Sequence, residues 1–277
     1  MSEENALLVE HVGKVVKITL NRPERMNAVT PGMFDDLREI LDGLDTAKTR
    51  AMVITGAGRA FCAGADISGR GSGTGGKPGD TSRSSLENHY NPGMLALMEA
   101  DIPVITAVNG AAAGIGATLA LSGDLIVAGK SAYFLQAFVN IGLVPDGGGT
   151  WILPKVMGLP RAMEAMLLGE RLPAEDAFAM GAINRCVEDD KVLEEAMALA
   201  ERLASGPTVA IGQIRKLARN AQGSSLADAM QAEAEAQQIA GNTQDFMIGA
   251  QAFAVAMRPS VRSQPSRTAL MNWTPDP

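Results

Sequence analysis

The chain has 277 residues and a formal net charge of −7, and 46% of its residues are hydrophobic. This length permits one large domain or two small ones with a sizeable core. The negative charge argues against nucleic acid as the main partner, because phosphate contacts need clustered Lys and Arg. No run approaches the roughly 18 consecutive apolar residues that a membrane span requires. We therefore expect neither a nucleic-acid nor a membrane partner.

Two features of the sequence indicate a cytoplasmic protein. Residues 1–5 are acidic and polar, unlike a secretory signal or an Arg-rich transit peptide. The two cysteines, Cys62 and Cys186, are too few for a disulfide framework, which fits a reducing compartment. Neither an H-E-x-x-H motif nor a cysteine pair indicates a metal, so we expect no metal site.

The first half of the chain alternates strand and helix patterns. Residues 7–9 and 15–20 predict two short strands joined at Gly13. Thr30 is a candidate N-cap for a helix over residues 31–44, with Pro31 in its first position. The other expected elements are strands at 51–55, 104–108 and 125–128, and helices at 86–100 and 114–121. This alternation predicts an α/β domain with crossover connections.

The second half of the chain is predicted to be almost entirely helical. A short strand at 184–187 interrupts candidate helices at 161–168, 173–180, 192–204, 207–221, 226–240 and 243–257. Arg215, Lys216 and Arg219 form the densest basic stretch. They lie among apolar residues at helical spacing, which predicts a solvated helix face.

A glycine-rich stretch at residues 68–85 contains a partial phosphate-loop pattern. Residues 71–77 match the first seven positions of that motif, but Pro78 replaces the Ser or Thr that would bind magnesium. No strand enters the motif, and Pro78 with Gly79 opposes a following helix. We interpret the stretch as a mobile surface loop.

Two other segments place small residues directly after short strands. They are Ala-Phe-Cys-Ala-Gly-Ala-Asp at 60–66 and Asn-Gly-Ala-Ala-Ala-Gly-Ile-Gly at 109–116. Small residues expose backbone amides, and the free amides of a first helical turn favour negative charge. Two such amides aimed at one carbonyl oxygen stabilise an enolate or a tetrahedral oxyanion. One donor of this kind typically contributes about 3–4 kcal/mol.

Four ordered segments together resemble the crotonase (enoyl-CoA hydratase/isomerase) family, over roughly residues 9–261. Residues 21–28 are similar to the family's N-R-P-x-x-x-N-A loop, which lines the CoA site. Residues 61–67 resemble F-x-A-G-x-D, and residues 108–116 resemble V-N-G-x-A-x-G-G-G. Residues 142–150 resemble the following G-L-x-P-x-x-G-G-T loop.

The resemblance implies a spiral of ββα units, an α/β fold, with a helical C-terminal section used for trimerisation. Residues 1–200 would form the core, 201–262 the helical oligomerisation region and 263–277 a tail. Residues 245–259 resemble the family's D-x-x-E-G-x-x-A-F-x-x-K-R-x-P ending. We therefore expect self-association to a trimer or hexamer.

The resemblance also implies an acyl-CoA substrate, with no separate cofactor. The oxyanion amides would be those of Ala65 and Ile115, and Ile115 stands where the family has a glycine. Arg25 is the best candidate cation for a CoA phosphate. The remaining expected substrate-binding residues are Met26, Ala28, Ala63, Gly64, Asp66, Ile67, Gly114 and Phe138. We expect the acyl pocket to draw on residues 68–98, and the sequence leaves the acyl group unspecified.

The two glutamates that position water in family hydratases are replaced by Thr118 and Phe138. A hydratase of the standard mechanism is therefore disfavoured. Asp146 resembles the acid of certain family isomerases, where one carboxylate moves a proton along the acyl chain beside a thioester enolate. Phe138, Ile141, Leu143 and Trp151 are expected to keep this carboxylate dry and to raise its pKa. Double-bond isomerisation of an enoyl-CoA is thus the favoured reaction.

Several alternatives remain at this stage. One alternative is that Asp146 has a structural role, since aspartate stabilises turns when its side chain hydrogen-bonds to its own backbone. In a dehalogenase it would be the nucleophile and would need a histidine, yet His11 falls in the first hairpin and His89 in a polar surface loop. Enoyl-CoA hydratase, acyl-CoA hydrolase and a non-catalytic CoA-binding scaffold stay open. Cys62 is interpreted as a packing residue, since no histidine is placed to activate it.

Overall fold

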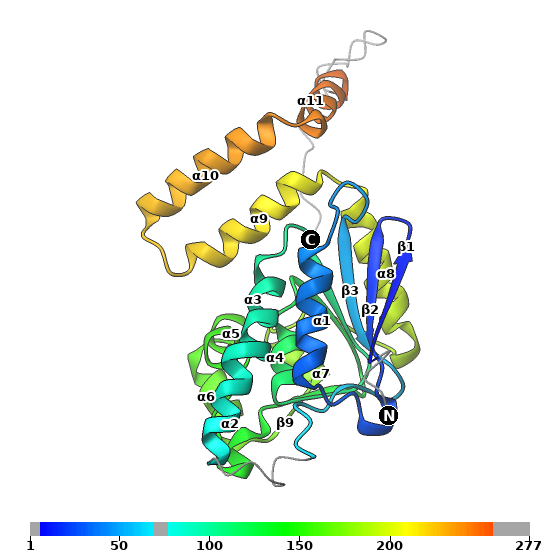
Figure 1. Ribbon diagram of the computed structural model, residues 1–277. Helices are drawn as coiled ribbons and strands as arrows, with labels where there is room; N and C mark the ends of the chain where they lie inside the picture. The colour runs from blue at the N-terminus through cyan, green and yellow to red at the C-terminus, as the bar shows by residue number, and fades with distance from the viewer. Residues whose placement is uncertain (1–5, 69–76, 257–277) are drawn as a thin grey trace, which may run out of the picture.

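The structure is a computed structural model that describes residues 6–68 and 77–256. Its centre is a six-stranded sheet with the strand order β1-β2-β3-β5-β7-β10 (Figure 1). The strands are β1 (Leu7–Val12), β2 (Val15–Leu20), β3 (Ala51–Gly56), β5 (Val104–Val108), β7 (Leu125–Gly129) and β10 (Arg185–Val187). The hairpin of β1 and β2 is antiparallel, and every later pairing in this sheet is parallel. Parallel neighbours need crossover connections, which the helices between them provide.

A second, smaller sheet lies beside the first. It joins β4 (Ala60–Cys62), β6 (Ala111–Ala113), β8 (Tyr133–Leu135) and β9 (Arg171–Pro173) in that order. Each of these strands has three residues, too few for an alternating pattern, and the sequence did not predict this sheet. Its first two strands open directly into the two glycine-containing segments singled out above.

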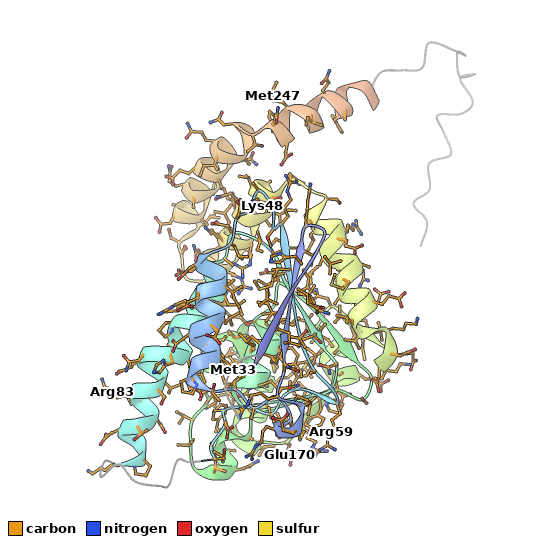
Figure 2. All side chains as sticks on the ribbon, turned by 45° about the vertical axis from the view of Figure 1, so that its right-hand side comes forward. Met33, Lys48, Arg59, Arg83, Glu170 and Met247 are labelled. Atoms are coloured by element: carbon orange, nitrogen blue, oxygen red, sulfur yellow. The ribbon has the colours of Figure 1, made fainter. Side chains whose placement is uncertain are left out.

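Helices cover both faces of the large sheet (Figure 1). On one face, Val15, Val53 and Ile105 pack against α8 (Val192–Ala204). This helix presents alanines at a spacing of four, so its backbone lies close to the sheet. On the other face lie α1 (Pro31–Asp42), α3 (Asn91–Glu99) and α4 (Ile115–Leu121), and Met33 of α1 is buried in the core there (Figure 2). The core is thus two layers of helix around one sheet.

The predicted start of α1 is confirmed. The hydroxyl oxygen of Thr30 accepts a hydrogen bond from the amide of Met33 at 3.4 Å, and Pro31 occupies the first helical position. Proline is well suited there because its missing N–H would have no helical partner. The strands predicted at 51–55, 104–108, 125–128 and 184–187 and the helix at 114–121 are also confirmed, within a few residues.

Two predictions around Pro78 are wrong. Helix α2 spans Pro78–Ser85, so Pro78 begins a helix rather than opposing one. As at Pro31, the missing N–H of a proline in the first helical turn would have no helical partner. The single helix predicted over 86–100 is divided into the π-helical turn η2 (Leu86–Tyr90) and α3. Residues 71–76 of the partial phosphate-loop pattern lie outside the described residues.

The later helices follow the predicted pattern with one omission. Helix α5 (Gly149–Met157) was not predicted, since Pro154 stands inside it. The others are α6 (Leu159–Leu168), α7 (Ala174–Ala179), α9 (Thr208–Ala221), α10 (Leu226–Gly241) and α11 (Gln244–Ala256). Helices α10 and α11 extend away from the core, with Met247 far from the sheet (Figures 1 and 2). Within the described residues, no helix is both long and apolar enough to cross a membrane.

The basic stretch on α9 is not the solvated face that its sequence predicted. Arg215 is only 5% exposed, and its guanidinium donates to Asp124 and to the carbonyls of Leu97, Met98 and Ala100. Burial lowers the pKa of this guanidinium below its usual value, although Asp124 opposes the shift. The buried arginine therefore fastens α9 to the end of α3, a contact that spans more than one hundred residues of sequence.

Arg215→Met is expected to lower the free energy of unfolding by about 3 kcal/mol, because it removes one of the two arginines that pair with Asp124 and leaves several carbonyls unpaired in a buried site. The matched control is Lys216→Met, whose ion pair with Asp101 is exposed and should contribute less than about 1 kcal/mol. Urea unfolding of both variants measures the difference. Equal losses in the two variants would contradict the buried role of Arg215.

Candidate active site

The loop at residues 21–28 is shaped by a buried asparagine. Asn27 is fully buried with a positive φ of 57°. Its side-chain Nδ2 donates to the carbonyls of Ala57 and Ala60 at 2.8 and 2.7 Å, and its Oδ1 accepts from the amide of Arg22 at 2.9 Å. The asparagine of this motif therefore holds the loop against the end of β3 rather than contacting a ligand.

Arg22 connects this loop to the first oxyanion segment. Its guanidinium donates to the carbonyl of Ala28 and, at 2.8 Å, to Oδ2 of Asp66. Asp66 also accepts from the hydroxyl of Ser68, and these bonds, with Ser68 first and then Arg22, lower its pKa to about 2. The carboxylate of Asp66, expected to line the substrate path, is thus engaged in joining two loops.

The backbone of the first oxyanion segment is fixed by pairing with Val29. The amide of Val29 donates to the carbonyl of Gly64, and the amide of Asp66 donates back to the carbonyl of Val29, both at 2.8 Å. This parallel bridge uses the groups on either side of Ala65. The Ala65 amide therefore points away from Val29, as an oxyanion donor requires.

The second segment turns sharply at Gly114, which has a positive φ of 54°. The amide of Gly114 donates to the carbonyl of Leu135 at 2.8 Å. Helix α4 begins at the next residue, Ile115, whose amide belongs to the first helical turn and has no partner within the helix. A Cβ atom built on Gly64 would lie 3.9 Å from the Cα of Gly114, so the two segments touch.

The isoleucine at the family's glycine position is accommodated inside the protein. The Ile115 side chain is buried, and a Cβ atom built on Gly147 would lie only 2.9 Å from its Cγ1. A glycine at position 147, with a positive φ of 60°, leaves the necessary room. The substitution therefore places a side chain between the oxyanion helix and the Asp146 turn.

Cys62 serves as a packing residue in this structure. A Cβ atom on Gly116 would lie 2.6 Å from its Sγ, so the first turn of α4 rests directly on the cysteine. Complete burial raises the pKa of the Cys62 thiol to about 12. A thiol with that pKa supplies almost no thiolate near neutral pH, which excludes it as a nucleophile.

Asp146 occupies the turn that leads into α5. Its carbonyl accepts from the amide of Gly149 at 2.9 Å and from the hydroxyl of Thr118 at 3.2 Å. Its carboxylate oxygen Oδ1 is buried. Since Thr118 and Ile115 are one turn apart on α4, this helix carries both the Ile115 amide, which was predicted as the second oxyanion donor, and the support of the Asp146 turn.

The apolar surroundings expected for Asp146 are only partly present in the single chain. Phe138, on the short helix η3 (Ala137–Ile141), is 8% exposed, and its ring lies 3.5 Å from a Cβ atom built on Gly114. Ile141, however, is 61% exposed, and Leu143 and Trp151 are also exposed. The ammonium group of Lys155 lies over the ring of Trp151. Of the four residues expected to form the dry wall, Phe138 is the buried one.

The predicted CoA-facing residues lie in the two joined loops. The backbone carbonyl of Met26 accepts a hydrogen bond from the amide of Ala63 at 2.9 Å. This bond joins the loop at residues 21–28 to the segment predicted to carry the first oxyanion amide. Arg25 is exposed at the end of the short helix η1 (Pro23–Arg25), and Ile67 is exposed on the other loop.

A cavity of about 500 Å³ is lined in part by the two glycines that follow Asp146. Its walls include Met94, Leu95 and Met98 of α3, and the backbone of Gly147 and Gly148 forms part of its floor. Trp151, Ile152, Arg219 and Asn220 also line it, as do Asn91 and Glu99. Among the described residues of the stretch 68–98, those that line this cavity all lie on α3.

His89 is not in a polar loop, as its sequence predicted, but in η2. Its Nδ1 lies 2.7 Å from Oδ2 of Asp35 on α1. Among the described residues, no group of three or more His, Cys, Asp or Glu side chains is arranged to hold a metal ion.

Comparison with known proteins gives a consistent family. The family described as Enoyl-CoA hydratase/isomerase matches residues 10–264. The chain is 42% identical over 254 residues to 1,2-epoxyphenylacetyl-CoA isomerase of Escherichia coli (strain K12), covering 91% of this chain and 97% of the relative. It is also 42% identical over 236 residues to a probable enoyl-CoA hydratase of Rhodobacter capsulatus, covering 85% of this chain and 90% of that protein.

Solved structures agree with this relationship. An enoyl-CoA hydratase from Bacillus anthracis superposes with a TM-score of 0.85 at 30% identity, covering 92% of this chain and 98% of the other. A putative enoyl-CoA hydratase/isomerase from Mycobacterium abscessus gives a TM-score of 0.84 at 34% identity, with the same coverage. The chain therefore belongs to the enoyl-CoA hydratase/isomerase family and has the crotonase fold.

Asp66→Asn is expected to destabilise the protein at pH 7 by about 2 kcal/mol, because the carboxylate is held charged by Ser68 and Arg22. The pKa of Asp66 is lower in the folded chain than in the unfolded one, so its contribution is complete above about pH 4 and falls as the pH drops towards 2. Urea unfolding of wild type and variant between pH 7 and pH 3 measures this. A stability difference that stays constant down to pH 3 would contradict the ion pair.

Proposed function

We propose that this protein moves the double bond of an enoyl-CoA, with Asp146 as the one group that takes and returns the proton. The observation that carries the proposal is the packing of the Asp146 turn on α4. That helix holds the Ile115 amide, so a carboxylate and an oxyanion donor share one rigid support. Such an arrangement suits proton removal next to a carbonyl, where charge develops on the thioester oxygen.

The reaction needs three contributions from the chain. The amides of Ala65 and Ile115 would hold the thioester oxygen and stabilise the enolate. Asp146 would remove a proton from one carbon of the acyl group, and the resulting carboxylic acid would return it two carbons along. Phe138 would keep water from the reacting carbons on the side of Gly114.

The chain supports an isomerase better than a hydratase. Thr118 is completely buried with its hydroxyl directed to backbone carbonyls, and Phe138 has no acid to offer. Neither residue can activate water as a carboxylate does. The relative from Escherichia coli carries the name of an isomerase, while other relatives are called probable hydratases. Hydration by this site would require Asp146 to act alone.

The remaining enzyme alternatives have less support. A dehalogenase or hydrolase using Asp146 needs a second group to activate water, and His89 is paired with Asp35 on α1. A non-catalytic CoA-binding scaffold is distinguished by exchange of the α proton of a saturated acyl-CoA with deuterated water. Exchange supports the enolate-forming enzyme, and binding without exchange supports the scaffold.

We further propose that CoA lies over the surface bordered by Arg25, Met26, Ala28, Ala63 and Ile67. Arg25 is the positively charged residue that we assign to the CoA phosphates. It lies at the end of η1 and is exposed to solvent. No separate cofactor takes part in this scheme, because the thioester itself supplies the activation.

Asp146→Asn is expected to lower isomerisation of a 3-enoyl-CoA by at least about 100-fold, the usual scale for losing a general base. Affinity for CoA and the unfolding midpoint should be nearly unchanged. The matched control, Asp101→Asn, removes an exposed carboxylate on another part of the chain. Steady-state rates with a small panel of 3-enoyl-CoA thioesters measure both variants.

If Asp146→Asn isomerises as fast as wild type, another group moves the proton and the proposed function is wrong. The reverse design places glutamates at Thr118 and Phe138, where family hydratases carry them. This double change should raise hydration slightly if it folds. Burying two new acids is the expected obstacle, so its unfolding midpoint is measured in parallel.

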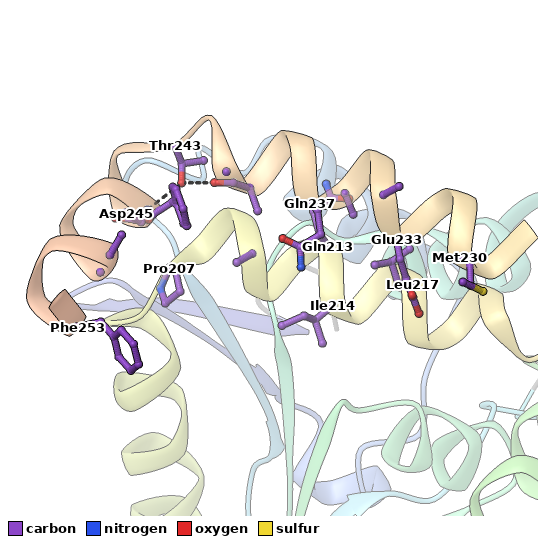
Figure 3. A pocket seen from close by; sticks show the side chains of 18 residues that line it. Pro207, Gln213, Ile214, Leu217, Met230, Glu233, Gln237, Thr243, Asp245 and Phe253 are labelled. Atoms are coloured by element: carbon purple, nitrogen blue, oxygen red, sulfur yellow. Dashed lines mark hydrogen bonds between the residues drawn. The ribbon is translucent and has the colours of Figure 1, made fainter. Parts of the chain in front are cut away.

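Self-association through the C-terminal helices is a further proposal. Helices α9, α10 and α11 enclose a groove of about 880 Å³ lined by Ile214, Leu217, Met230 and Phe253 (Figure 3). Phe253 is 67% exposed in the single chain, and several other apolar side chains of these helices are similarly exposed. Apolar surface of this extent is typical of an interface. We expect a trimer or hexamer by sedimentation at micromolar concentration, and a monomeric mass would contradict it.

A further inference from the structure

Tyr90 is a buried tyrosine that the proposed mechanism does not use. It is 1% exposed and is the last residue of the π-helical turn η2. Its hydroxyl donates a hydrogen bond to the backbone carbonyl of Val29 at 3.3 Å, although the two residues are 61 positions apart in the sequence. Tyr90 therefore bonds the same residue that pairs with the groups on either side of Ala65.

Tyr90 is held against α1 by its ring and by the residue before it. The ring packs edge to face on Phe34 of α1, with the centroids 5.0 Å apart and the planes inclined at 65°. Nδ1 of His89 lies 2.7 Å from Oδ2 of Asp35, also on α1. Helices α1 and α3 lie side by side, with η2 at the start of α3 (Figure 1). These contacts fix the ring and with it the reach of the hydroxyl.

The wide helical turn that ends at Tyr90 is followed by a proline. The amide of Asn91 bonds the carbonyl of Leu86, five residues back instead of four. The next residue, Pro92, has no amide to donate to Asn88, and its ring would clash with that carbonyl in a regular α-helical turn. Single π turns within helices are frequently found at functional sites, which directs attention to the residue at the end of this one.

Val29 sets the direction of the Ala65 amide through one planar peptide unit. The carbonyl of Gly64 and the amide of Ala65 belong to the same trans peptide, so they point in opposite directions. The amide of Val29 bonds this carbonyl at 2.8 Å, and the amide of Asp66 bonds the carbonyl of Val29 at the same distance. The hydroxyl of Tyr90 is a second donor to the Val29 carbonyl, whose oxygen has two lone pairs to accept both.

We propose that Tyr90 is a positioning residue for the oxyanion amide of Ala65, and that it acts through Val29. Without the phenol hydroxyl, a buried carbonyl loses one of its two donors, and the pairing that directs the amide loses part of its support. A fixed donor is most effective when charge develops on the thioester oxygen in the transition state. Loss of its alignment therefore lowers turnover more than binding. The inference rests on the oxyanion role of Ala65 in the proposed function, and it does not depend on Asp146.

Tyr90→Phe keeps the ring on Phe34 and removes only the hydroxyl. We expect kcat for isomerisation of a 3-enoyl-CoA to fall by about 10-fold, less than the roughly 100- to 1000-fold that follows loss of an oxyanion donor itself. KM should stay within about two-fold of wild type. The matched control is Tyr133→Phe, at the other tyrosine of the chain, which keeps its ring beneath Arg171 and should leave both constants unchanged.

Val15→Ala separates positioning from general stability. Val15 is buried on the opposite face of the large sheet, against α8. This variant should lower the Tm more than Tyr90→Phe does, because it leaves a cavity in the core, and it should keep the wild-type kcat. If the kcat of both variants instead falls in step with the Tm, Tyr90 has only a structural role and the proposal is overturned.

The carbonyl stretch of a bound thioester reports on the oxyanion amides without any turnover. Hydrogen bonds to a carbonyl oxygen lower its stretching frequency, so we would record difference infrared spectra of bound hexanoyl-CoA that is isotopically labelled at the thioester carbonyl. We expect the same low frequency in wild type and Tyr133→Phe, and a higher one in Tyr90→Phe.

The spectrum and the rates distinguish the two proposals. A frequency in Tyr90→Phe equal to that of wild type would overturn the positioning role of Tyr90 and leave the proposed function standing. A wild type that shows the low frequency but no isomerisation would refute the proposed isomerase, while a higher frequency in Tyr90→Phe would still support the positioning role.

Discussion

The contact between Gly64 and Gly114 is the constraint on which the site depends. A carbonyl oxygen can be held by two backbone amides only if the two segments that carry them touch, and both glycines have a positive φ, which other residues rarely adopt. A Cβ atom on Gly64 would lie 3.1 Å from the carbonyl of Ala113. The small sheet brings the segments to the same edge, because its strands β4 and β6 are parallel neighbours and end there.

Helix α4 connects this contact to the proposed base. It is short and completely buried, with its first turn packed on Cys62 and its next turn beneath the Asp146 loop. The isoleucine at position 115 fills space that Gly147 leaves open. A buried helix with two such fixed contacts cannot shift easily, since close-packed interiors transmit strain. The Ile115 amide and the turn that carries Asp146 are therefore held against each other.

The C-terminal helices are attached to this unit by electrostatics rather than by a large apolar contact. Arg215 and Arg219 of α9 share Asp124 and bond backbone carbonyls at the end of α3 and near Ser122. Helix α3 in turn lines the cavity next to Gly147. Arg219 and Asn220 of α9 also line that cavity, so changes in α9 can reach it directly as well as through α3.

The sequence by itself determined the large sheet, the helices that have an apolar face, and the family to which the chain belongs. Periodicity and caps such as Thr30 and Pro31 are local signals, so a single chain displays them directly. The three-residue strands of the second sheet are too short to show such a signal. The sequence also showed no sign that Arg215 is buried, because its spacing on α9 resembles that of a solvated face. Tertiary structure decided these features because each depends on partners distant in sequence: the three-residue strands on one another, and Arg215 on Asp124.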